Sequence, residues 1–242
     1  MKKLLLLVFA LVSTTLFAQP DNDFKDLLSL FVDQKYEKVL NKAENYTMGD
    51  DTKKHPLPYL YIAMSLYEMS KIEKYTQMEE YKGAFKDAMK FCSKYGAKDK
   101  DKKYVDEFPD FFMNIRKDIT VEGDMQYEQG KFTKAKLYYD CLIDVEPNDA
   151  GAHIMLGLCF AHAKAVKDSD TELAKAKELL VSQSYSTRNE EVKKLLKNAL
   201  IVYANELGNA SDKKKAAEWM GYANELFMDD PEWQIQYNTV TK

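Results

Sequence analysis

The stretch "GKFTKAKLYYDCLIDVEPNDAGAHIMLGLCF", residues 130–160, contains two helical runs with a short turn between them. In the first run, residues recur at the spacing of one helix face: Ala135, Tyr139 and Leu142. Pro147 cannot continue that helix, and it disfavours helical angles at the residue before it. Asn148 and Asp149 are favourable caps for a following helix. The sequence therefore predicts two helices joined by a sharp corner.

The same pattern extends in both directions from this corner. A further predicted helix, "ITVEGDMQYEQ", precedes Gly130, and glycine is favoured just past a helix end. Small residues followed by an aromatic, a polar turn and a second apolar face recur along the chain, although less clearly. With only 9 Gly and 6 Pro and almost no alternation typical of strands, the chain is predicted to be all-α.

These features resemble the tetratricopeptide repeat (TPR) family, whose unit is a helix-turn-helix of about 34 residues. The resemblance is carried by "YEQGKFTKAKLYYDCLIDVEPND" followed by "LGLCF", and it extends loosely over residues 21–231. It implies an α-solenoid of about five antiparallel helix pairs. One pair cannot bury its own apolar face, whereas a stack can, and the stack leaves a concave surface that binds proteins or peptides.

The spacing of the repeats is uneven, which predicts an irregular superhelix. We expect extra residues between paired helices around Lys71–Glu80 and Val166–Thr171, and an interruption at Lys94–Glu107. At the end of the chain, Trp233 and Tyr237 are four residues apart, which favours a short helix capping the last pair.

Residues 1–18 have a basic head, a short apolar run and a small-residue exit, which is typical of a secretory signal peptide. The apolar run is shorter than the roughly 20 residues that a membrane-spanning helix needs. We therefore expect cleavage near Ala18, a helical domain over residues 19–242 without a membrane span, and export to the bacterial periplasm or beyond. The composition resembles exported proteins of Bacteroidota-like bacteria.

Composition and motifs narrow the function classes further. A net charge of −4 is untypical of nucleic-acid binding, which usually needs a basic face. The three cysteines lie in apolar helical runs and are expected to be buried, with a Cys141–Cys159 disulfide as the alternative. The sequence contains no phosphate-binding loop, nucleophile elbow or zinc-protease motif, and its three histidines do not form a metal-ligand set. We expect no enzymatic activity, no cofactor and no metal.

The TPR resemblance implies that groove residues lie on the first helix of each pair. In this sequence it selects eleven positions: Leu60, Met64, Tyr67, Glu68, Thr120, Asp124, Tyr127, Glu128, Ile154, Leu158 and His162. Asn205 is a weaker candidate. The mixture of apolar and acidic side chains favours a ligand with apolar anchors and basic residues.

Two functions are compatible with such a groove. The first is a non-enzymatic scaffold that binds an envelope or secreted protein or peptide. The alternative is a site for a glycan or peptidoglycan fragment, in which Tyr67 and Tyr127 would stack on sugars beside Glu68 and Glu128.

Overall fold

The computed structural model describes residues 24–209 and 211–241, and the regular secondary structure in these ranges is helical throughout. The expected signal peptide, residues 1–18, lies outside the described residues. The α-helices are α1 (Lys25–Val32), α2 (Tyr36–Met48), α3 (Pro56–Met69), α4 (Glu73–Thr76), α5 (Ala84–Lys98), α6 (Pro109–Glu128), α7 (Phe132–Val145), α8 (Ala150–His162), α9 (Val166–Ser182), α10 (Glu190–Asn209), α11 (Lys213–Gly221), α12 (Asn224–Phe227) and α13 (Pro231–Thr241).

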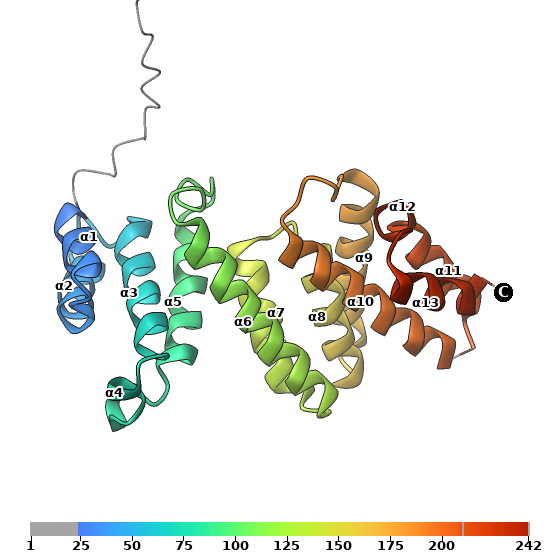
Figure 1. Ribbon diagram of the computed structural model, residues 1–242, viewed down its shortest axis with the longest axis horizontal. Coiled ribbons are helices and arrows are strands. Elements are labelled where there is room, and N and C mark those ends of the chain that lie inside the picture. The colour runs from blue at the N-terminus through green and yellow to red at the C-terminus, as the bar shows by residue number, and fades with distance from the viewer. Residues whose placement is uncertain (1–23, 210, 242) are drawn as a thin grey trace, which may run out of the picture.

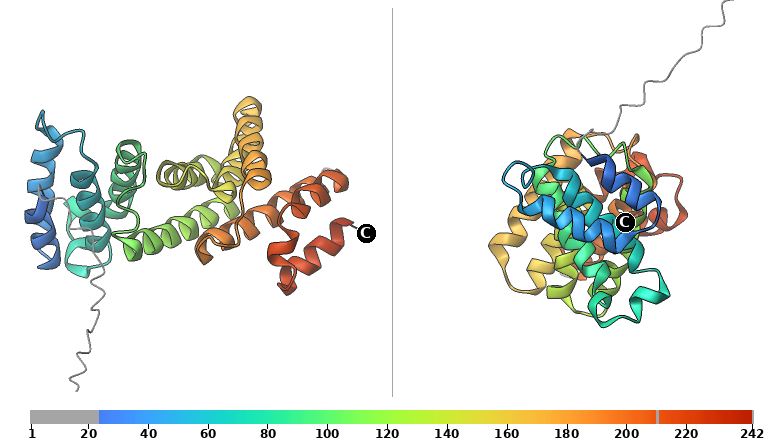
Figure 2. Two further views of the ribbon diagram at one scale, coloured as in Figure 1. Left: turned by 90° about the horizontal axis from the view of Figure 1, so that it is seen from above. Right: turned by 90° about the vertical axis from the view of Figure 1, so that its left-hand side faces the viewer.

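The long helices form five pairs that follow one another along the molecule: α1 with α2, α3 with α5, α6 with α7, α8 with α9, and α10 with α11. Figure 1 shows these pairs as an elongated row that runs from α1 and α2 at one end to α11–α13 at the other. The row is irregular, because α10 packs on both α8 and α6, whereas α9 extends to one side (Figure 2). The predicted all-α solenoid of about five helix pairs is confirmed.

The turns that separate α6, α7 and α8 form as the sequence predicts. Gly130 has a φ of +69°, a left-handed conformation that glycine adopts without steric cost. At the next corner, the side chain of Asp149 accepts a hydrogen bond from the backbone N–H of Ala152 at 3.1 Å and caps α8. These two local features reverse the chain twice, so that α7 can pack against both α6 and α8.

Two of the expected irregularities are real and one is not. The segment after α3 forms the short helix α4 and a 3-10 turn, Glu79–Tyr81, before α5 begins. An irregular connection also separates α5 from α6, although α5 continues as far as Lys98. The predicted insertion at Val166–Thr171 is wrong, because these residues form the first turns of α9. Most polar residues here, apart from the buried Ser169, face solvent on a long helix, which resembles a loop in sequence alone.

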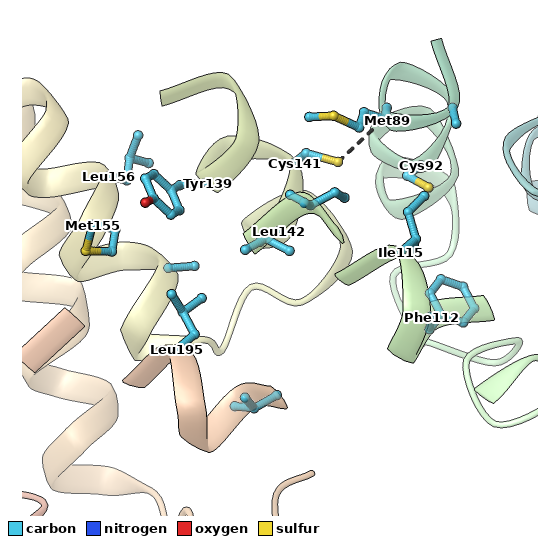
Figure 3. Packing of buried hydrophobic residues seen from close by; sticks show 14 of the residues in the cluster. Met89, Cys92, Phe112, Ile115, Tyr139, Cys141, Leu142, Met155, Leu156 and Leu195 are labelled. Carbon is cyan, nitrogen blue, oxygen red and sulfur yellow. Dashed lines mark hydrogen bonds between the residues drawn. The ribbon is translucent and has the colours of Figure 1, made fainter. Parts of the chain in front are cut away.

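Side chains from α5, α6, α7 and α8 meet in the middle of the core. Figure 3 shows Cys141 pointing from α7 toward α5, where its Sγ donates to the carbonyl oxygen of Met89 at 3.5 Å. Cys92, Cys141 and Cys159 are all buried and free, as expected from their apolar surroundings, and the alternative Cys141–Cys159 disulfide does not form. Burial raises the pKa of the Cys141 and Cys159 thiols to about 12.

Both arginines of the chain stabilise the corner between α7 and α8. Arg116 of α6 binds the buried carboxylate of Asp149, and its Nη1 lies 3.2 Å from Oε2 of Glu146. Arg188, from the connection before α10, also contacts Glu146. The guanidinium groups therefore link three helix pairs at the point where the chain turns, and they match the planar carboxylates better than lysine would.

The C-terminal helix α13 lies against α10 and α11. Trp233 is fully buried, and its indole N–H donates to Oδ1 of Asn224 at 3.1 Å. Its ring packs on Phe227, with the centroids 5.1 Å apart. An aromatic cluster thus covers the apolar side of the last helix pair. None of the helices in the described ranges is both long and apolar enough to span a membrane.

Candidate binding site between helices α6, α8 and α10

Six of the eleven predicted groove residues are buried inside the solenoid: Leu60, Met64, Tyr67, Thr120, Ile154 and Leu158. These six side chains are therefore not accessible on an open surface of this structure. Five of them lie on α3 and α8, where twelve of 14 and ten of 13 residues are buried. A helix that is apolar on all sides is enclosed by its neighbours, so no face of it remains for a partner.

Four of the remaining residues gather at one place, where the C-terminal end of α6 lies near α8 and α10. They are Asp124, Tyr127, Glu128 and His162. Glu68 lies apart from them on α3, where its carboxylate is 3.7 Å from Nζ of Lys71 in the turn that follows the helix. The structure therefore reduces the long predicted groove to one local site.

A hollow of about 230 Å³ marks this site. Asp124, Tyr127 and Glu128 of α6 line one wall, and Glu232 at the start of α13 lines its edge. The apolar lining comes from α8 and α10 and consists of Met155, Ile201 and Val202, beside the amide of Asn198. The hollow combines an apolar surface with carboxylates, as expected for a site that holds an amphipathic ligand.

An aromatic cluster fixes one end of the hollow. The Tyr127 hydroxyl donates to Oε1 of Glu206 on α10, and Nε2 of His162 lies 2.9 Å from the same oxygen. The His162 ring stacks on Phe132 with the centroids 3.9 Å apart and the planes within 3°. Tyr127 and His162 therefore hold Glu206 from two sides, which fixes the position of a carboxylate beside the hollow.

The negative charges of the carboxylates that line the hollow are only partly balanced by basic side chains. Asp124 accepts a hydrogen bond from the Tyr139 hydroxyl at 2.7 Å. Burial raises the pKa of Asp124, and the nearby charge of Glu128 raises it further, while the Tyr139 hydrogen bond and Lys194 lower it in part. Glu128 is exposed and forms no ion pair with any described residue. Glu232 pairs with a lysine, because Nζ of Lys197 lies 2.8 Å from its carboxylate.

This arrangement favours a cation with an apolar neighbour. Asp124 and Glu128 line the hollow and Glu206 lies beside it, and none of the three forms an ion pair with a described lysine or arginine, so these carboxylates could accept from a basic group of a ligand. Across residues 24–209 and 211–241, no three His, Cys, Asp or Glu side chains are placed to share a metal ion. The site is therefore suited to recognition by charge and apolar contact.

Sequence reasoning missed the contribution of α10. Asn205 was the only candidate there, and its side chain is exposed, whereas the adjacent Glu206 makes the contacts with α6 and α8. Ile201 and Val202 read as ordinary core positions of an amphipathic helix. Only the packing of α10 across both α6 and α8 brings them to the hollow.

No family model matches the chain, and no curated protein matches it. A solved structure of the TPR2AB-domain:pHSP90 complex of yeast Sti1 is similar over 90% of this chain and 96% of that chain, with 11% sequence identity and a TM-score of 0.34. The helix pairs themselves define this fold as an all-α solenoid.

Proposed function

We propose that this chain is a non-enzymatic binding module that holds a segment of a partner protein in the hollow between α6, α8 and α10. The segment would bring a lysine or arginine to Asp124 and Glu128 and an apolar side chain to Ile201 and Val202. The observation that carries the proposal is that two carboxylates, those of Asp124 and Glu128, line an apolar hollow without an ion pair to a described lysine or arginine. The solenoid needs little movement to bind, because its corners and core are already fixed.

The alternative of a glycan site has less support. Sugar rings stack on exposed aromatic faces. Tyr67, one of the two tyrosines suggested for this role, is only 1% exposed, and Trp219 and Trp233 are also buried. Tyr127 is half-buried, and its ring packs edge-on against Phe132. A peptide with a basic and an apolar side chain fits these surroundings better.

We also propose that the chain works in the bacterial cell envelope, with an envelope or secreted protein as its partner. The proposal rests on the signal-like sequence of residues 1–18. Expression of the full chain in a bacterium, followed by mass spectrometry of the periplasmic fraction, tests it. A product that begins near Gln19 is expected, and an uncleaved product confined to the cytoplasm would contradict it.

A pair of peptides tests the binding mode directly. One fluorescent peptide carries leucine and lysine residues, and the second has serine in place of each leucine. We expect saturable binding of the first peptide by fluorescence anisotropy and much weaker binding of the second, because burial of about one leucine contributes on the order of 2 kcal/mol. Equal binding of the two peptides would show that charge alone attracts them and that the hollow is not used.

Two variants locate the binding site. Glu128→Lys reverses an exposed charge at the hollow and should weaken binding of the leucine–lysine peptide roughly five- to tenfold. Asp170→Lys makes the same change of net charge on α9, where Asp170 is exposed and does not line the hollow. The control variant should bind like the wild type. If both variants weaken binding equally, the effect comes from net charge and the proposed site is wrong.

A further inference from the structure

A second hollow, of about 640 Å³, lies between α5 and α7 and has the opposite charge. Four lysines line it: Lys86, Lys90 and Lys94 of α5, and Lys134 of α7. All four are exposed, although the chain as a whole carries a net charge of −4. The only acidic residue in the lining is Asp140, whose carboxylate is already bound by Lys136 at 2.6 Å.

The floor between these lysines is apolar. Met89 and Cys141 are buried at its base, Tyr138 is half-buried, and Leu137 is 52% exposed despite its size. An exposed leucine is unremarkable by itself, but here it lies in a depression that lysines surround. An apolar floor surrounded by lysines suits an amphipathic partner whose polar groups are negatively charged.

The lysines are available to such a partner. Among the described residues, neither Lys86 nor Lys134 forms an ion pair with an acidic side chain. Lys94 lies over the Phe91 ring at 4.4 Å, and Lys90 pairs with Asp87 in an exposed contact that a partner could exchange at little cost. Two of the four lysines therefore have no acidic partner among the described residues. The other two make only exposed contacts.

The spacing of the rim matches a helix. Lys86, Lys90 and Lys94 are four residues apart and line one side of α5 over about 12 Å, at 1.5 Å per residue. A partner helix lying parallel or antiparallel to α5 would place acidic residues at the same spacing and apolar residues on the adjacent stripe. Helix-in-groove recognition uses this geometry, with anchors at i, i+4 and i+7.

We propose that the hollow between α5 and α7 binds an acidic amphipathic helix of a partner protein, with its apolar stripe on Leu137 and Met89 and its carboxylates on the four lysines. This site is separate from the acidic hollow between α6, α8 and α10. A concave floor enclosed by lysines fits a helix better than a membrane surface, which would contact only the rim. The two sites would allow the solenoid to hold two segments of opposite charge.

The probe is a fluorescent helical peptide of about 15 residues with leucine at i, i+4 and i+7 and glutamate at flanking positions. Its control is a scrambled peptide of the same composition, in which the leucines no longer share a face. We expect saturable binding of the amphipathic peptide by fluorescence anisotropy, at least about fivefold tighter than the scrambled one, and weaker binding as salt is raised. Equal affinity for both peptides would overturn the proposal.

The double variant Lys86→Glu, Lys134→Glu should weaken binding at least about tenfold. Lys213→Glu, Lys214→Glu changes the net charge equally at exposed positions of α11 and should leave the affinity within about twofold of wild type. If both double variants weaken binding alike, the site is not between α5 and α7. Wild-type protein that sediments with phosphatidylglycerol vesicles but does not bind the peptide would also overturn the proposal.

The same variants separate this site from the one between α6, α8 and α10. Glu128→Lys should not weaken binding of the acidic peptide, and Lys86→Glu, Lys134→Glu should not weaken binding of the leucine–lysine peptide. Failure of one peptide to bind therefore leaves the result for the other unaffected. Loss of both interactions in either variant would mean that the two hollows do not act as separate sites.

Discussion

The hydroxyl of Tyr127 on α6 donates a hydrogen bond to the carboxylate of Glu206 on α10, 79 residues later in the chain. This bond joins helices from two different pairs, and it lies beside the acidic hollow. His162 contacts the same carboxylate from α8, at 2.9 Å. Three helices thus meet at one side chain, which couples the geometry of the candidate site to the packing of the solenoid.

Tyr127→Phe removes the hydroxyl and retains the ring. We expect the free energy of unfolding, measured by urea denaturation, to fall by about 1 kcal/mol, the net contribution of a typical hydrogen bond. Tyr237→Phe on α13 is the matched control, since the Tyr237 hydroxyl forms no hydrogen bond with the described residues, and its change should stay within about 0.5 kcal/mol. Equal losses in the two variants would mean that the bond to Glu206 does not stabilise the fold.

Gly96→Ala tests the close approach of α5 to the end of α7. A Cβ atom at Gly96 would overlap the carbonyl oxygen of Asp144, a backbone atom that cannot rotate away. We expect a loss of about 3 kcal/mol in the free energy of unfolding, or more. Gly208 on α10 is the control, because a Cβ there meets nothing within 4 Å.

Gly208→Ala should instead stabilise the protein by about 0.5 kcal/mol, since alanine loses less backbone freedom than glycine in a helix. Thermal unfolding of the two variants under one condition gives the comparison. An unchanged melting temperature for Gly96→Ala would show that α5 and α7 do not pack as closely as described.

Arg116→Met tests the buried ion pair at the corner before α8. The substitution leaves the carboxylate of Asp149, which has no exposed surface, without its guanidinium partner. Loss of one partner of a buried pair typically costs about 3–5 kcal/mol. Lys117→Met is the control, because it removes one positive charge from the neighbouring exposed position on α6. It should lower the free energy of unfolding, measured by urea denaturation, by less than about 0.5 kcal/mol.

The comparison also separates two roles of Asp149. Its second oxygen caps α8, so Asp149→Asn should retain the cap and lose the ion pair. Similar losses of unfolding free energy in Asp149→Asn and Arg116→Met would show that the ion pair is the main contribution of Asp149 to stability. An Arg116→Met protein with the unfolding free energy of the wild type would contradict a stabilising role of the ion pair.

The raised pKa of His153 leads to a prediction of how the free energy of unfolding depends on pH. Burial lowers the pKa of His153, but hydrogen bonds to Glu172 and to the carbonyl oxygen of Pro147 raise it more, so the pKa lies above 6.5 in the folded state. The protonated form is therefore stabilised by folding. Its contribution is complete below the unfolded pKa of about 6.5 and is lost as pH rises through the folded pKa.

We therefore expect His153→Gln to lower the free energy of unfolding more at about pH 5.5 than at about pH 8.5, because only the histidine gains from protonation. Urea denaturation of both proteins at the two pH values gives this difference. A larger effect of the substitution at the higher pH would reverse the sign and show that His153 is held neutral in the folded protein.

The residues around the corner at Pro147 were sufficient to predict the local fold. Gly130, Pro147 and Asp149 act through backbone conformation and capping, which depend on neighbours within a few residues. The order of helices and the number of pairs follow from such signals. The insertion wrongly expected at Val166–Thr171 shows the limit, because a solvated helix face and a polar loop have similar compositions.

The candidate site was less predictable, since it depends on which side of each helix its neighbours cover. The apolar residues of α3 and α8 occur on every face, so Leu60, Ile154 and Leu158 carried no signal that distinguishes groove from core. Tyr127 and Glu128 were predicted because the TPR resemblance selects positions on the first helix of a pair. Glu206 and Val202 were missed because α10 reaches α6 only through the irregular stacking of the pairs.

Capture of the native partner tests the central claim most directly. The baits are the chain from Gln19 to Lys242, a site variant with Glu128→Lys and Val202→Asp, and a control variant with Asp170→Lys and Val181→Asp at exposed positions of α9. Each bait is incubated with the envelope fraction of the source cells, and bound proteins are identified by mass spectrometry. We predict that one protein is captured by the wild-type and control baits, is lost with the site variant, and is displaced by the leucine–lysine peptide. Capture of the same proteins by all three baits, or of none by any, would contradict the assignment of the hollow between α6, α8 and α10 as a protein-binding site.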